Sequence, residues 1–113
     1  MLPPETLVWH RAAKTDEVAQ DDVIRVDIGS RGIALYNVGG HFFATDDACT
    51  HQRARLSDGF VIDDVIECPR HQGRFHIASG RALGAPVSRG LVVHPVKLDG
   101  DVVCVGLPPE PVA

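Results

Sequence analysis

The sequence predicts an all-β fold built from small antiparallel sheets. Short apolar runs rich in Val and Ile recur along the chain, as expected for strands. Clusters of Gly, Asp, Asn and Ser separate these runs and are typical of tight turns. Only residues 12–20 look helical, and because they lack a sustained apolar stripe we expect at most a single turn there.

Strands are expected wherever an apolar run lies between two turn signals. In chain order, these ranges are 7–9, 23–28, 33–38, 41–44, 60–62, 65–67, 91–98 and 102–105. The turns between them are expected at 29–32, 37–40, 57–59, 63–64 and 99–101. Asp99 and Gly100 favour a tight hairpin, because this pair suits a two-residue turn with positive backbone angles.

Composition and charge indicate one acidic domain, residues 1–113. The chain carries a net charge of −4 and has one Trp, one Tyr and four Phe, which argues against nucleic-acid binding. The N-terminus lacks a charged leader, and no stretch approaches the roughly 20 apolar residues of a membrane span. Three cysteines do not suggest a secreted disulfide framework. We therefore expect a cytoplasmic monomer without a membrane partner.

Two short motifs, each with one cysteine and one histidine, provide four potential metal ligands. Cys49 and His51 are separated by one residue, and Cys68 and His71 by two. Two thiolates and two imidazoles can hold a tetrahedral zinc ion, or a [2Fe-2S] centre with Cys on one iron and His on the other. Ligand type alone leaves both alternatives open. The third cysteine, Cys104, lies in an apolar run and is expected to be a small buried side chain.

Three segments around these motifs resemble the Rieske family, in particular the small ferredoxins that serve bacterial ring-hydroxylating oxygenases. Residues 49–59 are similar to the first cluster loop of that group, 66–75 to the second, and 79–87 to the loop with Gly and Pro that closes over the cluster. The resemblance implies one [2Fe-2S] cluster, with ligands Cys49, His51, Cys68 and His71.

The same resemblance implies a division of the single domain. A cluster-binding subdomain, 45–90, would be inserted in a β-barrel-like base, 1–44 and 91–107. This subdomain would consist of two ligand loops and a Pro loop that contains Pro86.

The resemblance also places the iron bound by His51 and His71 at the molecular tip, where electrons would enter and leave. Residues 49–90 hold six arginines against four acids, although the whole chain is acidic. Arg53 and Arg70 lie inside the ligand loops, so one interpretation is an arginine collar that docks an acidic partner. The alternative is that these arginines are scattered and solvated, some of them paired with nearby acids.

Residues beside the ligands indicate a low reduction potential. Respiratory members of the family carry an additional cysteine in each ligand loop, and the two form a disulfide; here these positions are Ala54 and Arg70. Those members also direct two hydroxyl groups at cluster sulfurs, where this chain has Gly73 and Phe75. With fewer donors to stabilise the reduced state, we expect a potential nearer about −150 mV than about +300 mV, the limits for Rieske centres.

The function that fits these features is one-electron transfer from a flavoprotein reductase to a terminal Rieske non-haem iron oxygenase. Oxygenase activity in the chain itself would need a further domain with a mononuclear iron site, so we do not expect an enzyme. A Rieske-like small subunit of a nitrite reductase is one alternative, and a zinc-stabilised binding module is another.

Overall fold

Three antiparallel sheets form the structure, a computed structural model that describes residues 6–50, 53–70, 72–85 and 87–109. The first sheet has the order β1 (Val8–Lys14), β10 (Val102–Leu107), β9 (Val96–Asp99). The second has the order β2 (Asp22–Ile28), β3 (Arg31–Val38), β4 (His41–Asp46), β8 (Val93–His94). The third has the order β5 (Phe60–Ile62), β6 (Val65–Glu67), β7 (Arg74–His76). The all-β prediction is confirmed.

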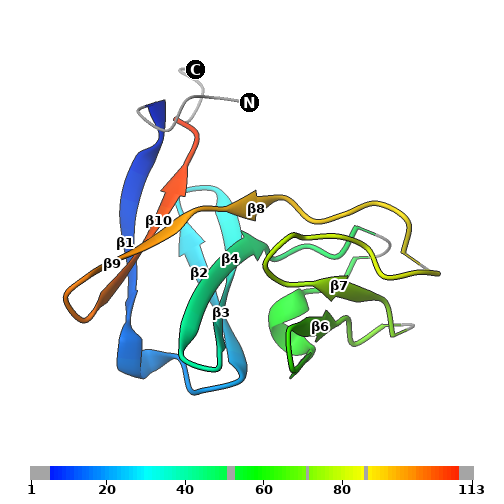
Figure 1. Ribbon diagram of the computed structural model, residues 1–113. Coiled ribbons are helices and arrows are strands. Elements are labelled where there is room, and N and C mark those ends of the chain that lie inside the picture. Colours follow the sequence, from blue (N-terminus) through cyan, green and yellow to red (C-terminus); the bar gives the residue numbers. More distant parts are fainter. Residues whose placement is uncertain (1–5, 51–52, 71, 86, 110–113) are drawn as a thin grey trace.

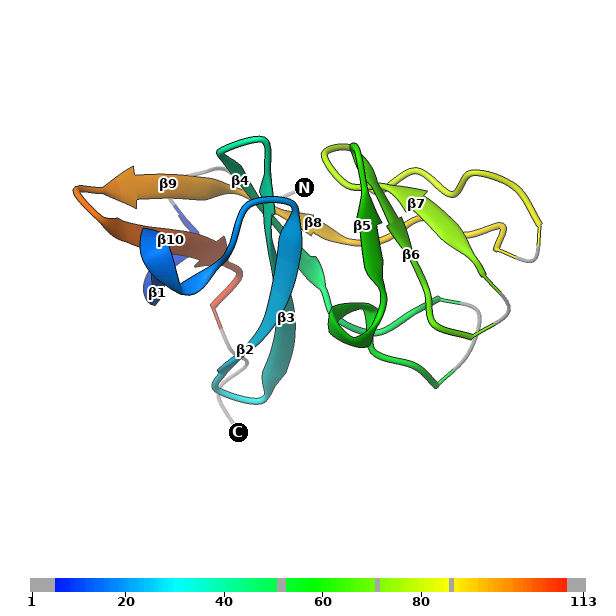
Figure 2. The ribbon, with the colours of Figure 1, turned by 90° about the horizontal axis from the view of Figure 1, so that it is seen from below.

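The third sheet lies to one side of the first two. Figure 1 shows β1, β9 and β10 at the left and β6 and β7 at the right, with β2, β3 and β4 between them. The view from below shows the same separation, with β5, β6 and β7 forming a distinct layer (Figure 2). Its strands come from residues 60–76, between β4 and β8 in the chain. All strand pairs are antiparallel.

Strand β3 separates two hydrophobic cores. Ile33 and Leu35 belong to a cluster with Val103 and Val105 of β10. Successive side chains of a strand point to opposite faces, so the neighbours of Ile33 and Leu35 point the other way. They are Ala34 and Tyr36, which belong to a second cluster with the third sheet and the ligand loops. All four of these β3 side chains have no exposed surface.

Several strand boundaries differ from those expected. Strand β1 continues to Lys14, so residues 12–14 are extended, and the helical segment is a single 3-10 turn, η2 (Thr15–Glu17). The strand expected at 91–98 is two short strands, because Pro95 lacks the backbone N–H that a continuous ladder needs. A second 3-10 turn is η3 (Leu56–Asp58). No helix in the described ranges has the length and apolar character needed to cross a membrane.

The tight hairpin between β9 and β10 is confirmed, with a shifted centre. Asp99 pairs with Val102, so the two turn residues are Gly100 and Asp101. Gly100 has a φ of 60°, which favours glycine, whereas Asp101 is not among the residues with positive φ. The turn thus needs one positive φ, at its first central position, rather than two.

Candidate metal centre

Both motif cysteines lie in the same buried cluster, as free thiols. Cys49 is 8% exposed and Cys68 is 1% exposed. Burial raises the pKa of the Cys68 thiol, and the neighbouring Cys49 raises it further. The backbone N–H and the guanidinium charge of Arg70 act in the opposite direction, because both stabilise a thiolate at Cys68. Two adjacent buried sulfurs are a donor pair suited to a soft metal, and a bound metal would supply the positive charge that a thiolate pair needs.

Each cysteine begins a loop that a backbone hydrogen bond closes. The N–H of Cys49 donates to the carbonyl oxygen of Ala54 at 3.0 Å, and that of Cys68 to Gly73 at 2.7 Å. His51 and His71 fall within these two loops in the sequence. Both histidines, like Pro86, lie outside the described residues. The structure therefore brings the two cysteines together, and the histidine assignment stays a prediction.

The end of the glycine and proline segment and the residues just beyond it contact both ligand loops. Thr50 Oγ1 donates to the carbonyl oxygen of Arg89 at 2.6 Å. A Cβ atom at Gly73 would lie 2.6 Å from Cγ1 of Val87 and 3.9 Å from Cβ of Cys68. Val87 is buried, so the second loop fits beneath this segment because Gly73 has no side chain. Phe75 is fully buried in the same cluster, directly beyond the second loop.

An ionic network that sequence reasoning missed supports the first loop. Asp47 is 1% exposed, and its Oδ2 accepts from Arg25 Nη1 at 2.7 Å and from Ser57 Oγ at 2.8 Å. Its Oδ1 accepts from the backbone N–H of Ser57 at 2.7 Å. The carbonyl oxygen of Asp47 accepts from the N–H of Leu56 at 2.7 Å. These bonds join both ends of the first loop to β2.

The predicted docking arginines are exposed and share one cavity. Arg53 and Arg70 come from different ligand loops and line a cavity of about 520 Å³. Neither forms an ion pair with another side chain in the described part of the chain. The two arginines therefore line the same open cavity.

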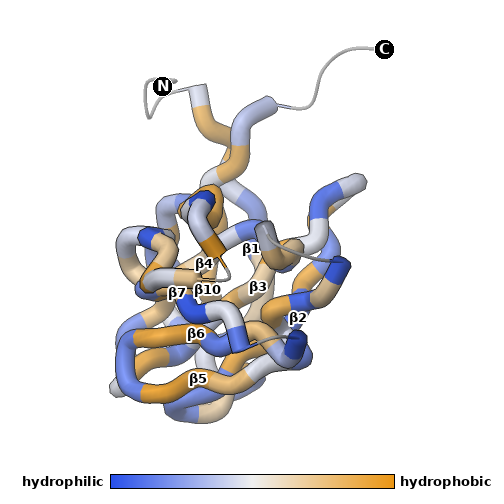
Figure 3. The backbone as a smooth tube through the Cα atoms, turned by 90° about the vertical axis from the view of Figure 1, so that its right-hand side faces the viewer, coloured by the Kyte–Doolittle hydropathy of each residue, from blue (hydrophilic) through white to orange (hydrophobic). Residues whose placement is uncertain are grey.

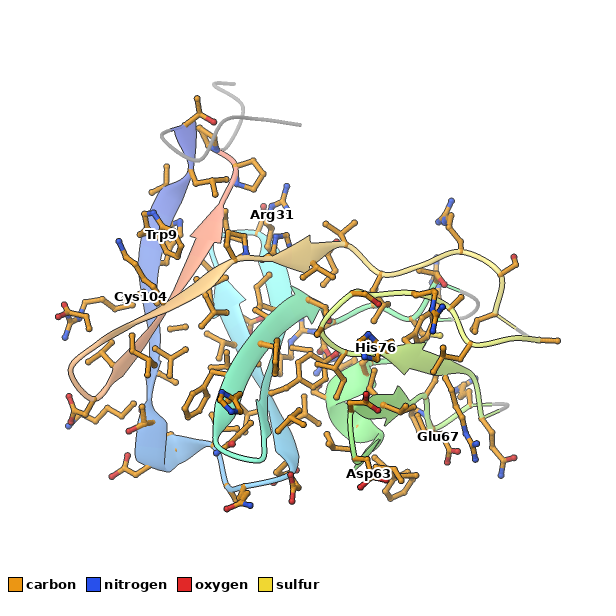
Figure 4. The ribbon with its side chains drawn as sticks, in the orientation of Figure 1. Trp9, Arg31, Asp63, Glu67, His76 and Cys104 are labelled. Atoms are coloured by element: carbon orange, nitrogen blue, oxygen red, sulfur yellow. The ribbon has the colours of Figure 1, made fainter. Side chains whose placement is uncertain are left out.

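Three further potential ligands have other roles: Cys104 is packed in a core, and His76 and His94 have hydrogen-bond partners. Cys104 is 5% exposed, which confirms the prediction of a small buried side chain, and Figure 4 shows it in the first sheet, away from Glu67 and His76 of the third sheet. His94 Nε2 lies 2.8 Å from Asp46 Oδ1. His76 contacts Ser79 and Asp64. These carboxylate partners lie far away in the sequence, so residue spacing could not reveal them.

Comparisons with known proteins identify the family. The model of the family described as "Rieske [2Fe-2S] domain" matches residues 8–105. The ferredoxin component of a naphthalene 1,2-dioxygenase system from Pseudomonas aeruginosa is 46% identical over 88% of this chain and 95% of its own length. The ferredoxin component of a 2,4-dinitrotoluene dioxygenase system from a Burkholderia species is 44% identical over 80% of this chain and 88% of its own.

Solved structures agree in fold. The ferredoxin of Sphingomonas yanoikuyae B1 superposes with a TM-score of 0.84 at 35% identity, over 88% of this chain and 98% of its own. A structure of a complex of reduced oxygenase and oxidised ferredoxin in carbazole 1,9a-dioxygenase matches with a TM-score of 0.84 at 33% identity, over 92% of this chain and 97% of the matched one. The chain thus belongs to the Rieske [2Fe-2S] family, and within it to the ferredoxins, which carry electrons and are not enzymes themselves.

Proposed function

We propose that this ferredoxin receives single electrons from a flavoprotein reductase and delivers them to a terminal Rieske non-haem iron oxygenase that acts on an aromatic compound. The observation that carries the proposal is the similarity to ferredoxin components of aromatic dioxygenase systems over nearly their full length. A related ferredoxin has been captured in complex with its terminal oxygenase, which supports the second half of the proposed route.

We assign the ligands of the cluster to the two motifs. Cys49 and Cys68 would hold one iron, and His51 and His71 the other. When bound, the cluster supplies a site that takes up and releases one electron. The burial of both cysteines supports the assignment, because a buried thiolate pair is protected from water and oxidants. The N–H of Arg70, directed at Cys68, would stabilise negative charge on that sulfur.

We further propose that electrons enter and leave through His51 and His71, with Arg53 and Arg70 as docking residues. Gly73, Phe75 and Pro86 would form the layer around the ligands. The contact of Gly73 with Val87 supports this layer on the side of the second loop. Residues 45–90 would act as the cluster-binding subdomain, which agrees with the separate sheet of β5, β6 and β7. We expect a cytoplasmic location, because the three cysteines form no disulfide with one another. We also keep the expectation of a monomer.

Two alternative functions predict different properties of the purified protein. A putative small subunit of a nitrite reductase shares the fold at 22% identity with a TM-score of 0.76, which carries no functional argument. Such a subunit would copurify with a larger reductase, whereas a freestanding carrier would not. A zinc module would be colourless, whereas a [2Fe-2S] cluster absorbs visible light.

The direct test is a reconstituted electron-transfer assay. The purified holoprotein is mixed with the reductase and oxygenase of a naphthalene dioxygenase system, NADH and naphthalene, and product formation is measured with and without the ferredoxin. Product that depends on the ferredoxin supports the proposal. Reduction of the cluster by the reductase without any delivery to this or another aromatic-ring oxygenase would contradict it.

A further inference from the structure

A cleft rich in arginine lies between the two ligand loops and the second sheet. Its lining includes four arginines from three segments: Arg25 of β2, Arg53 and Arg55 of the first loop, and Arg70 of the second. Its volume is about 520 Å³, within the usual range for a site that takes a small group. Figure 3 shows the face of the molecule that carries the third sheet and the ligand loops, where hydrophilic segments alternate with hydrophobic ones beside β2.

Arg25 is fixed in place at the edge of this cleft. Its Nη1 donates to the buried Asp47 at 2.7 Å and its Nε to Asp27 at 3.0 Å. A Cβ on Gly32 of β3 would collide with this guanidinium, so the glycine makes room for it. The charge of Arg25 is thereby balanced by two carboxylates, and its side chain forms a fixed part of the cleft lining.

The remaining three arginines of the cleft are not balanced in this way. Arg53, Arg55 and Arg70 are exposed, and none of them pairs with an acid among the residues that the structure describes. Asp58 is the one acidic residue among the described residues of the lining. By contrast, Arg74, on the neighbouring strand β7, pairs with Glu67 at 2.9 Å. Positive charge is therefore concentrated in the cleft, within a chain whose overall charge is −4.

We propose that this cleft binds the carboxylates of an acidic segment on a protein partner, and that Arg55 contributes to binding together with Arg53 and Arg70. Each planar guanidinium can donate two parallel hydrogen bonds to one carboxylate. Because Arg53 and Arg70 lie within the ligand loops, an acidic segment held here would bring the partner's surface against the histidine loops. The inference deepens the docking role proposed above and rests on it for the identity of the partner.

Carboxylates fit the cleft better than the phosphates of a nucleic acid. Among the described residues, the lining contains Gly, Ala and Pro beside the charged side chains and no Phe, Tyr or Trp on which a base could stack. The excess of negative charge elsewhere on the chain would also repel an extended polyanion. A short acidic segment reaches only the cleft and avoids that repulsion.

The test measures binding of a fluorescein-labelled hexaglutamate peptide to the holoprotein by fluorescence anisotropy, at about 10 mM salt, where the Debye length is about 30 Å. Arg55→Glu reverses a charge of the cleft and leaves both ligand motifs intact. Arg81→Glu is the matched control, since Arg81 is also exposed, forms no ion pair within the described ranges and does not line the cleft. Visible absorption verifies that each variant retains its cluster.

We expect Arg55→Glu to weaken peptide binding by about fivefold or more and Arg81→Glu by less than about twofold. Arg55→Lys, which keeps the charge, should retain part of the affinity. Equal losses in the two Glu variants, no measurable binding to the wild type, or tighter binding of a six-nucleotide oligothymidylate would overturn the proposal. Peptide binding that depends on Arg55 without electron delivery to any oxygenase would instead contradict the carrier route and leave the cleft assignment intact.

Discussion

Asp47 and Arg25, 22 positions apart in the sequence, form an ion pair of 2.7 Å that joins the first ligand loop to the second sheet. The Asp47 side chain is almost completely buried, whereas that of Arg25 is 30% exposed. Since Ser57 donates two further bonds to the same carboxylate, Asp47 connects β2 with both ends of the loop that begins at Cys49.

Asp47→Asn should destabilise the holoprotein. The amide cannot accept from all three donors, so a buried polar group is left unsatisfied, and the midpoint of thermal cluster loss should fall by roughly 5 to 15 °C. The measurement is visible absorption during heating. Asp27→Asn is the matched control, because Asp27 pairs with the same Arg25 but is 70% exposed. Equal shifts in the two variants would contradict a special role for Asp47.

Gly73→Ala should weaken the contact between the second loop and the segment that covers it. The added methyl group would lie 2.6 Å from Val87 Cγ1, so the backbone or Val87 must move, and the cost is about 1–3 kcal/mol. We expect faster loss of the cluster on warming. Combining the change with Val87→Ala should reduce the effect of Gly73→Ala, because the clashing atom is then absent. If the two changes are simply additive, the contact is not the cause.

The midpoint potential of the cluster should lie below zero, nearer about −150 mV than about +300 mV. Gly73 and Phe75 offer no side-chain hydroxyl, so the more negative, reduced cluster has fewer hydrogen bonds to stabilise it. Protein-film voltammetry gives the value directly. Phe75→Tyr should shift the potential upward if the added hydroxyl reaches a cluster sulfur. A wild-type midpoint well above zero would refute the argument.

Serine substitutions should distinguish the two proposed ligand cysteines from Cys104. Cys49→Ser or Cys68→Ser removes a thiolate from the proposed donor set, so the visible absorption of the cluster should be lost or strongly changed. Cys104→Ser should preserve it, because Cys104 lies in β10 of the first sheet and contributes to packing there. Metal analysis of the purified variants provides a second readout. An intact spectrum for Cys68→Ser would disprove the ligand assignment.

Stability should decline above about pH 10 because of Tyr36. Burial raises the pKa of this hydroxyl well above its usual value, and the nearby charge of Asp47 raises it further. The unfolded chain loses the tyrosine proton first as the pH rises, so ionisation favours unfolding until the pH passes the folded pKa. Thermal midpoints between about pH 8 and 11 test this, with Tyr36→Phe expected to reduce the decline.

The chain has a single tyrosine, so tyrosinate absorption reports on Tyr36 alone. In the folded protein this absorption should not develop at the ordinary pKa of about 10. Its appearance there would show that Tyr36 is not protected from ionisation.

Sequence reasoning predicted the β class and most strands, because short β-branched runs and turn residues are local signals. It also singled out Cys49 and Cys68, because each belongs to a short local motif with a histidine, and the structure places both cysteines in one buried cluster. Contacts between distant positions could not be read in this way. Nothing near Asp47 indicates Arg25 as its partner, and the requirement for glycine at position 73 appears only when Val87 is packed against it.

Strand β3 is buried on both faces, and this constrains its pairing with the neighbouring strands. A slip of one residue along β3 would exchange Tyr36 with Leu35 between cores of different shape, so misaligned pairings are strongly disfavoured. Strand β4 is aligned to β3 through the pair Ile33 and Asp46, and Cys49 follows three residues later. The register of β3 thus sets where the first ligand loop begins, before any metal is bound.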